Sequence, residues 1–197
     1  MSHTVEFFFD FASPYAYMGS EMVEDVCKRT GAELQWMPMV LGGVFQARGH
    51  TAPLDKPWRQ QYMAGDLKGL SEAHKIPYKP RTQFIFKPIL ALRAALQVPQ
   101  GAQRAKAVHA MFRGVWAQDL DLGDPVVLAK LLTDAGFDGK ALVEGTNAQP
   151  VKDELKNNTD QAVARGVFGA PTMFLDGKRM FWGHDRLPLL EHYLNAG

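Results

Sequence analysis

The stretch FDFASPYAY, residues 9–17, decides the fold, because it joins an apolar segment to a helix through a sharp corner. The segment Val5–Phe11 is rich in Phe and too short for a helix, so it predicts a β-strand. Ser13 and Pro14 then supply a helix N-cap and a proline in the first helical turn. The helix is expected to end at Gly31. The stretch therefore predicts strand, corner and helix, with Ser13 at the corner.

The other strand signals lie near the two ends of the chain. Residues 33–39 predict a second strand, and a loop is expected at Leu41–Gly43. Near the C-terminus, the Asp-Gly pair at 176–177 predicts a hairpin between short strands at 172–175 and 179–182. Helical periodicity fills the chain between these ends and returns after the hairpin. The predicted helices cover residues 58–74, 87–98, 103–116, 125–135, 140–144, 150–165 and 186–195.

This order of elements is β-α-β, a block of helices, then α-β-β-α. Its two ends together predict an α/β fold, a four-stranded mixed sheet flanked by helices, which is the thioredoxin-like arrangement with an all-helical insertion. We expect a discontinuous thioredoxin-like domain, residues 1–44 and 146–197, and a helical insertion domain, residues 45–145. A cleft between these domains is the expected ligand site.

The composition favours a small ligand. With 22 Lys and Arg against 21 Asp and Glu, the net charge of +1 gives no general attraction to nucleic acid or to an anionic membrane. No apolar run or leader pattern indicates a membrane span or a signal peptide, so a cytoplasmic protein is expected. Cys27 is the single cysteine, which excludes an internal disulfide and a Cys-x-x-Cys pair. A reaction that needs a thiol would therefore use one from another molecule.

Ser13 has two readings at this stage. As a helix cap it contributes about 1 kcal/mol to stability. Alternatively, its hydroxyl donates a hydrogen bond to a thiolate at the positive end of the helix, where backbone N–H groups favour an anion. The chain lacks a G-x-S-x-G elbow, so Ser13 is a poor candidate for a nucleophile.

Two further corners leave alternatives open. Most X-Pro bonds are trans, so Pro171 could simply open an edge strand. A cis bond would instead turn Ala170 outward, where its backbone could pair with a peptide-like ligand. Asp185 is either the N-cap of the last helix or a partner for a ligand ammonium group.

The remaining polar residues give weaker signals. The six histidines show no metal-binding spacing, so no metal site is expected. Cys27 is expected to be an apolar packing residue. Five basic residues are expected to be solvated unless they face a cleft, where they could bind a substrate carboxylate: Arg48, Lys56, Arg59, Arg81 and Lys87.

The three corners together resemble a known family. The stretches FDFASPYAY (9–17), GVFGAPTMF (166–174) and WGHDR (182–186) are similar to the 2-hydroxychromene-2-carboxylate isomerases and the related kappa-class glutathione transferases. In the insertion, GGVFQARGHTAP (42–53) and YMAGDL (62–67) extend the resemblance. It implies a DsbA-like thioredoxin fold, a homodimer, and glutathione as cofactor or cosubstrate.

The resemblance also implies roles for individual residues. Ser13 falls on the catalytic serine that hydrogen-bonds the glutathione sulfur. Ala170, before a cis Pro171, falls on the residue that pairs with the cysteinyl backbone. The remaining implied glutathione-binding residues are the γ-glutamyl corner Trp182, Gly183, His184 and Asp185, together with His50 and Arg59, which stand where kappa-class transferases have an asparagine and a lysine.

The implied substrate contacts depart from the family pattern. Phe45 stands where characterised isomerases have a lysine, and Phe84 where they have a tyrosine; Asp55-Lys56 replaces an Asn-Arg pair. Polar substrate contacts are lost while the glutathione corners remain, so the resemblance specifies the cofactor better than the substrate.

Three functions follow as hypotheses. The first is a glutathione-dependent isomerase acting on an unsaturated acid of aromatic breakdown, since thiolate addition turns a double bond into a rotatable single bond. The second is a kappa-like transferase that conjugates glutathione to electrophiles. The third is a non-catalytic DsbA-like protein that binds peptides at the proline corner.

Overall fold

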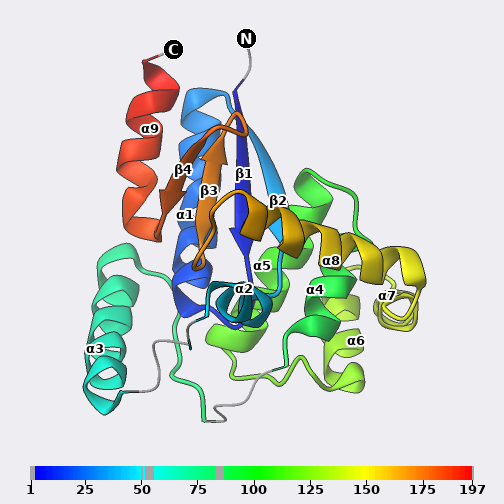
Figure 1. The fold of residues 1–197 in the computed structure, drawn as a ribbon. Helices are drawn as coiled ribbons and strands as arrows, with labels where there is room; N and C mark the ends of the chain where they lie inside the picture. Colours follow the sequence, from blue (N-terminus) through cyan, green and yellow to red (C-terminus); the bar gives the residue numbers. More distant parts are fainter. Residues whose placement is uncertain (1–2, 50, 52–55, 83–86, 197) are drawn as a thin grey trace.

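The computed structural model describes residues 3–49, 51, 56–82 and 87–196. Its sheet has the strand order β2-β1-β3-β4 (Figure 1). β1 (Thr4–Phe9) pairs in parallel with β2 (Glu33–Pro38) and antiparallel with β3 (Thr172–Leu175), and β3 pairs antiparallel with β4 (Arg179–Trp182). The predicted thioredoxin-like mixed sheet, built from the two ends of the chain, is confirmed.

Helices surround this sheet and fill the described chain between its two halves. Figure 1 shows α8 crossing in front of the β1–β2 side of the sheet, with α1 behind the sheet and α9 beside β4. No helix in the described ranges is long and apolar enough to cross a membrane. The helices are α1 (Pro14–Thr30), α2 (Leu41–Arg48), α3 (Pro57–His74), α4 (Ile89–Leu96), α5 (Ala102–Trp116), α6 (Pro125–Asp134), α7 (Gly139–Gly145), α8 (Gln149–Ala164), the short 3-10 helix His184–Arg186, and α9 (Leu187–Asn195).

The aromatic run of β1 supplies the core on both faces of the sheet. Successive strand residues point to opposite faces, so Phe7 and Phe9 lie against Trp36, with ring centroids 5.3 and 5.8 Å away. Phe8 faces the other side and meets Phe174 at 5.8 Å. All five rings are buried, and each buried Phe stabilises the fold by about 2 to 3 kcal/mol. The buried strand β1 therefore leads into the Ser13 corner from a well-packed sheet.

Two local signals read from the sequence are confirmed. Asp176 and Gly177 have φ values of 49° and 68°, and the Lys178 N–H donates to the Leu175 carbonyl at 3.0 Å. This is the type I′ turn that Asp-Gly favours. Gly31 ends α1 in the left-handed conformation, with φ 70°.

The loop predicted at Leu41–Gly43 is instead the first turn of α2, and that prediction was wrong. No local side chain caps this helix. The Leu41 N–H donates to a carboxylate oxygen of Asp10 at 2.8 Å, and the Val40 N–H donates to Oγ1 of Thr159 at 3.0 Å. Acceptors distant in sequence thus satisfy groups that a helix start leaves open. α2 also runs across the boundary predicted at residues 44–45, and the division into two domains stays a prediction.

A charged cluster joins α5 to α1. His109 lies 3.6 Å from Glu21 and 3.2 Å from Glu24, while Arg113 binds both carboxylate oxygens of Glu21 at 2.8 and 2.6 Å. Burial alone would lower the pKa of His109, but the two carboxylates outweigh it and raise that pKa to about 9. His109 is therefore a partly buried cation at neutral pH.

We expect the stability of the protein to fall as this imidazolium loses its proton. The folded-state pKa lies above the ordinary value of 6.5, so the stabilisation is complete below that value and is lost as pH rises through about 9. Urea unfolding measures the free energy of unfolding at neutral pH and at about pH 10. Between these two pH values we expect this free energy to fall by about 2 kcal/mol more in the wild type than in His109→Gln, a figure reduced for the partial exposure of Glu24. Equal losses in the two proteins would contradict this assignment.

Candidate functional site

Three distant segments meet at the N-terminus of α1. The Ser13 hydroxyl donates to the Ala170 carbonyl at 3.0 Å, which joins the first corner to the second. Gly19 of α1 permits the close approach of the third: a Cβ at this position would lie 3.2 Å from Cγ of Pro171 and 3.4 Å from Cβ of His184. The structure thus brings the three corners predicted from the sequence to one place.

Ser13 is the N-cap of α1, as predicted. Its hydroxyl oxygen accepts from the Ala16 N–H at 3.1 Å, and its side chain is buried, with 6% of the residue exposed. A serine hydroxyl has a single hydrogen to donate, and here the Ala170 carbonyl receives it. A ligand sulfur could take this hydrogen only by replacing the Ala170 carbonyl as the acceptor.

Asp10 supports the corner from beneath, and sequence reasoning missed it. Its carboxylate accepts from the N–H groups of Ala12 at 2.9 Å and Leu41 at 2.8 Å, and its carbonyl accepts from the Ser13 N–H at 3.0 Å. Burial raises its pKa to about 6, although these two N–H bonds oppose the rise. Asp10 therefore ties the Ser13 turn to the start of α2. The sequence did offer one signal for this role, because Asp10 is a single carboxylate directly after an aromatic strand.

The Ala170–Pro171 bond is cis. Within the part of the chain that the structure describes, no hydrogen bond uses the Ala170 N–H, whereas the Pro171 carbonyl accepts from the Gly183 N–H at 2.9 Å. The indole nitrogen of Trp182 lies 2.4 Å from where a Cβ on Gly169 would be. Trp182 and Gly183 are thus packed onto the proline corner.

His184 and Asp185 differ in their surroundings. The His184 ring stacks on Tyr15, with centroids 5.5 Å apart and planes 7° from parallel, and burial lowers its pKa. Asp185 is exposed and accepts from Arg186 at 2.9 Å. The predicted N-cap role of Asp185 is wrong, because no side chain caps the helical turns that follow. Its carboxylate remains accessible to a ligand cation.

The other predicted contacts are scattered. Arg59 lies on α3 with its guanidinium 5.0 Å above the Trp58 ring, and Phe45 is partly buried on α2. Lys56 is the N-cap residue of α3. His50, Asp55 and Phe84 lie outside the described residues.

Two of the basic residues expected to be solvated donate to backbone carbonyls; Arg48 is nevertheless exposed, whereas Arg81 is largely buried, so the expectation is wrong for Arg81. Arg48 donates to the carbonyls of Val163 and Val167, at 2.5 and 3.0 Å. Arg81 donates to the Leu120 carbonyl at 2.9 Å, with 8% of its side chain exposed. Their cationic heads are therefore used in holding loops and helix ends together.

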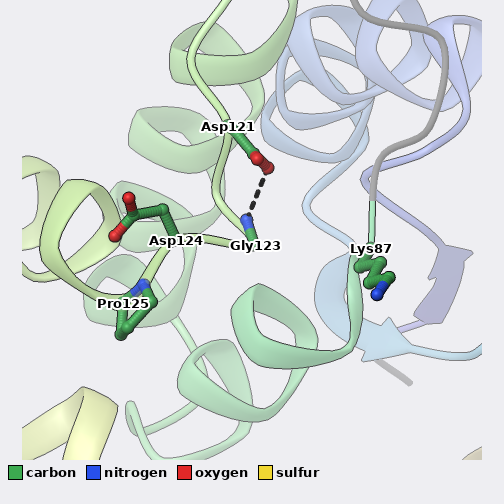
Figure 2. Close-up of a pocket in the computed structure, with 5 residues that line it drawn as sticks. All are labelled: Lys87, Asp121, Gly123, Asp124 and Pro125. Atoms are coloured by element: carbon green, nitrogen blue, oxygen red, sulfur yellow. Dashed lines mark hydrogen bonds between the residues drawn. The ribbon is translucent and has the colours of Figure 1, made fainter.

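A cavity of about 420 Å³ lies beside the start of α6 (Figure 2). Its lining includes Lys87, Asp121 and Asp124 and, among the residues that the structure describes, none of the predicted glutathione contacts. Both carboxylates already accept hydrogen bonds from backbone N–H groups: Asp121 accepts from the Gly123 N–H at 2.9 Å, and Asp124 caps α6. We therefore place the candidate site at the Ser13 corner.

The described residues contain no group of three or more His, Cys, Asp or Glu arranged to hold a metal ion. Cys27 is buried within α1, and burial raises its pKa to about 12. Such a thiol stays protonated at neutral pH and packs as an apolar side chain. The predicted packing role of Cys27 is confirmed.

Comparison with known proteins agrees with this geometry. A family model described as DSBA-like thioredoxin domain matches residues 4–195. The 2-hydroxychromene-2-carboxylate isomerase of Sphingobium xenophagum is 31% identical over 98% of this chain and 99% of that protein. Glutathione S-transferase kappa 1 of Homo sapiens is 29% identical over 98% of this chain and 92% of that protein. A solved 2-hydroxychromene-2-carboxylate isomerase has a TM-score of 0.89 at 26% identity, covering 98% of this chain and 95% of that one.

These matches and the three corners define the class as the DSBA-like thioredoxin domain proteins. Within that class, the chain belongs to the family of the 2-hydroxychromene-2-carboxylate isomerases and the kappa-class glutathione transferases. The members compared are enzymes, and the match extends over nearly the whole of each chain.

Proposed function

We propose that the protein is a glutathione-dependent isomerase of the 2-hydroxychromene-2-carboxylate type. The observation that carries the proposal is the hydrogen bond between Ser13 and the Ala170 carbonyl. It places a hydroxyl donor and a backbone carbonyl 3.0 Å apart at the positive end of α1. The sulfur and backbone of a cysteinyl residue need such a donor and such a carbonyl side by side.

The residues present fit glutathione through an exchange of hydrogen bonds. The Ser13 hydroxyl turns from the Ala170 carbonyl to the ligand sulfur, while it still accepts from the Ala16 N–H. The Ala170 carbonyl and N–H are then used by the cysteinyl backbone, in the manner of an added strand. The exposed carboxylate of Asp185 binds the γ-glutamyl ammonium group. His50 and Arg59 are assigned to the tripeptide by the resemblance alone.

The chain supplies positioning and electrostatics, and glutathione supplies the nucleophile. Bound glutathione would supply a thiolate nucleophile, whose addition to a conjugated carbon and later elimination would make a double bond transiently a rotatable single bond. The Ser13 hydroxyl and the N-terminus of α1 stabilise the negative charge on sulfur. Phe45 and Phe84 are the proposed contacts for the acceptor. We further propose a homodimer, as the resemblance implies, which a mass measurement in solution tests. A cytoplasmic location is proposed from the sequence pattern.

The fate of glutathione separates isomerase from transferase. We expect a catalytic amount of glutathione to sustain turnover of 2-hydroxychromene-2-carboxylate, with free thiol unchanged at the end of the reaction, because addition is followed by elimination. A thiol assay alongside the absorbance change of the substrate measures both quantities. Stoichiometric loss of thiol with a chloronitrobenzene, and no isomerisation, would favour the kappa-like transferase instead.

Binding itself is tested by thermal unfolding. Glutathione at 100 times its dissociation constant would stabilise the folded protein by about 2.7 kcal/mol. We therefore expect millimolar glutathione to raise Tm. An unchanged Tm would contradict both enzyme proposals and favour a peptide-binding protein.

A further inference from the structure

Tyr15 contacts two of the elements around the candidate site, yet the chemistry proposed above gives its side chain no role. Its ring stacks on His184 at 5.5 Å, and its hydroxyl donates to Oδ2 of Asp66 at 2.8 Å. Asp66 belongs to α3, within the YMAGDL stretch. Tyr15 therefore connects α1 and the His184 corner to a helix of the insertion.

Hydrophobic packing holds α3 weakly. Of its 18 residues, Leu67 alone is buried, while Trp58 and Tyr62 are 63% and 71% exposed. A helix in water depends mainly on the packing of an apolar face, and this face consists of Leu67 with the partly buried Leu70, which fixes the rotation of the helix weakly. The Tyr15–Asp66 hydrogen bond adjoins Leu67 and supplies a directional contact at that point.

The same contact sets the direction of Arg59. Arg59 and Asp66 are seven residues apart in α3, close to two full turns, so they share one face of the helix. Fixing Asp66 against Tyr15 therefore turns this face of the helix toward α1, while the Arg59 guanidinium itself lies 5.0 Å from the Trp58 ring.

The electrostatics of the pair suit a permanent hydrogen bond. Burial raises the pKa of Tyr15 first, and the hydrogen bond to Asp66 raises it further. The phenol therefore keeps its proton at physiological pH and remains a donor. Burial also lowers the pKa of His184, so a neutral imidazole stacks on the ring.

We propose that Tyr15 and Asp66 are positioning residues that hold α3 so that Arg59 meets the carboxylate of bound glutathione. This inference rests on the proposed glutathione function. On this inference, Tyr15 and Asp66 increase the affinity for glutathione, and Ser13 acts in the chemical step.

Tyr15→Phe tests the proposal because it keeps the ring that stacks on His184 and removes only the hydroxyl. Tyr62→Phe is the matched control, since it makes the same change at an exposed tyrosine of α3. In Tyr15→Phe we expect faster hydrogen exchange of the α3 amides, a KM for glutathione raised about tenfold, and kcat within about twofold of the wild type. The control should match the wild type in all three.

Arg59→Ala shows whether the effect passes through Arg59. If it does, adding Tyr15→Phe to Arg59→Ala should raise KM by less than about twofold, because coupled residues are not additive. A tenfold rise in KM from Tyr15→Phe in both the wild type and Arg59→Ala would overturn the link to Arg59. Unchanged hydrogen exchange and unchanged KM in Tyr15→Phe would overturn the positioning role.

If the wild type does not bind glutathione, the proposed function fails on its own, and the cofactor assignment fails with it. Exchange in α3 then still shows whether Tyr15 fixes the helix.

Discussion

Replacing Ser13 with alanine is expected to lower the glutathione-dependent rate by about 100- to 1000-fold, the usual effect of removing one donor to a reacting anion. The hydroxyl is 3.0 Å from the Ala170 carbonyl and caps α1 through the Ala16 N–H. Loss of the cap should cost about 1 kcal/mol of stability, so the variant should remain folded. Steady-state kinetics at saturating glutathione, with circular dichroism for the fold, measure the two effects separately.

Ser20→Ala is the matched control for this change. Ser20 is buried in the same helix and donates to the Tyr17 carbonyl at 2.7 Å, away from the corner. Its loss should alter stability slightly and leave the rate within about twofold of the wild type. If Ser13→Ala kept the wild-type rate, the hydroxyl would have no catalytic role. An equal loss of rate in both variants would point to damage to α1 instead.

Gly19→Leu is expected to cost about 3 kcal/mol of stability, because it overpacks the contact between α1 and the other two corners. Even a Cβ at this position would lie 3.2 Å from Pro171, 3.3 Å from Phe7 and 3.4 Å from His184. A larger side chain must push Pro171 and His184 away from α1. We therefore expect a lowered Tm together with loss of the stabilisation that glutathione gives.

Gly65→Leu in α3 isolates this packing effect. Among the described residues, and leaving aside its chain neighbours and the backbone of its own helix, no atom lies within 4 Å of a Cβ placed on Gly65, which is exposed. Leucine favours a helix over glycine by about 0.7 kcal/mol, so this variant should equal or exceed the wild type in stability. If Gly19→Leu matched the wild type in Tm and in its response to glutathione, the close approach of the corners would have no importance for the site.

The fold was largely predictable because its strands carry local signals. Phe-rich β1, the Ser13-Pro14 corner and the Asp176-Gly177 turn each specify their conformation within a few residues. α2 was not predictable in this way. Its start depends on Asp10, which is 31 positions away in the sequence from Leu41.

In the candidate site, too, residues with local sequence signals were predicted and residues that depend on distant contacts were not. Ser13, Ala170 and His184 were found because each stands at a corner with its own motif. Tyr15 and Asp66 were not assigned, since their hydrogen bond joins residues 51 positions apart and leaves no mark on either stretch. Asp10 was missed although it directly follows the aromatic strand, because its bond to Leu41 joins two elements that are distant in the sequence.

The pKa of the bound glutathione thiol tests the central claim most directly. Titrating the ultraviolet absorbance of the thiolate, with glutathione bound to wild type and to Ser13→Ala, measures this pKa in each. We expect the wild type to lower it about two units below the free value of about 8.5, and Ser13→Ala to return most of that shift. A thiol that titrates in the wild-type complex as it does in free solution, or identically in the two proteins, would contradict the account.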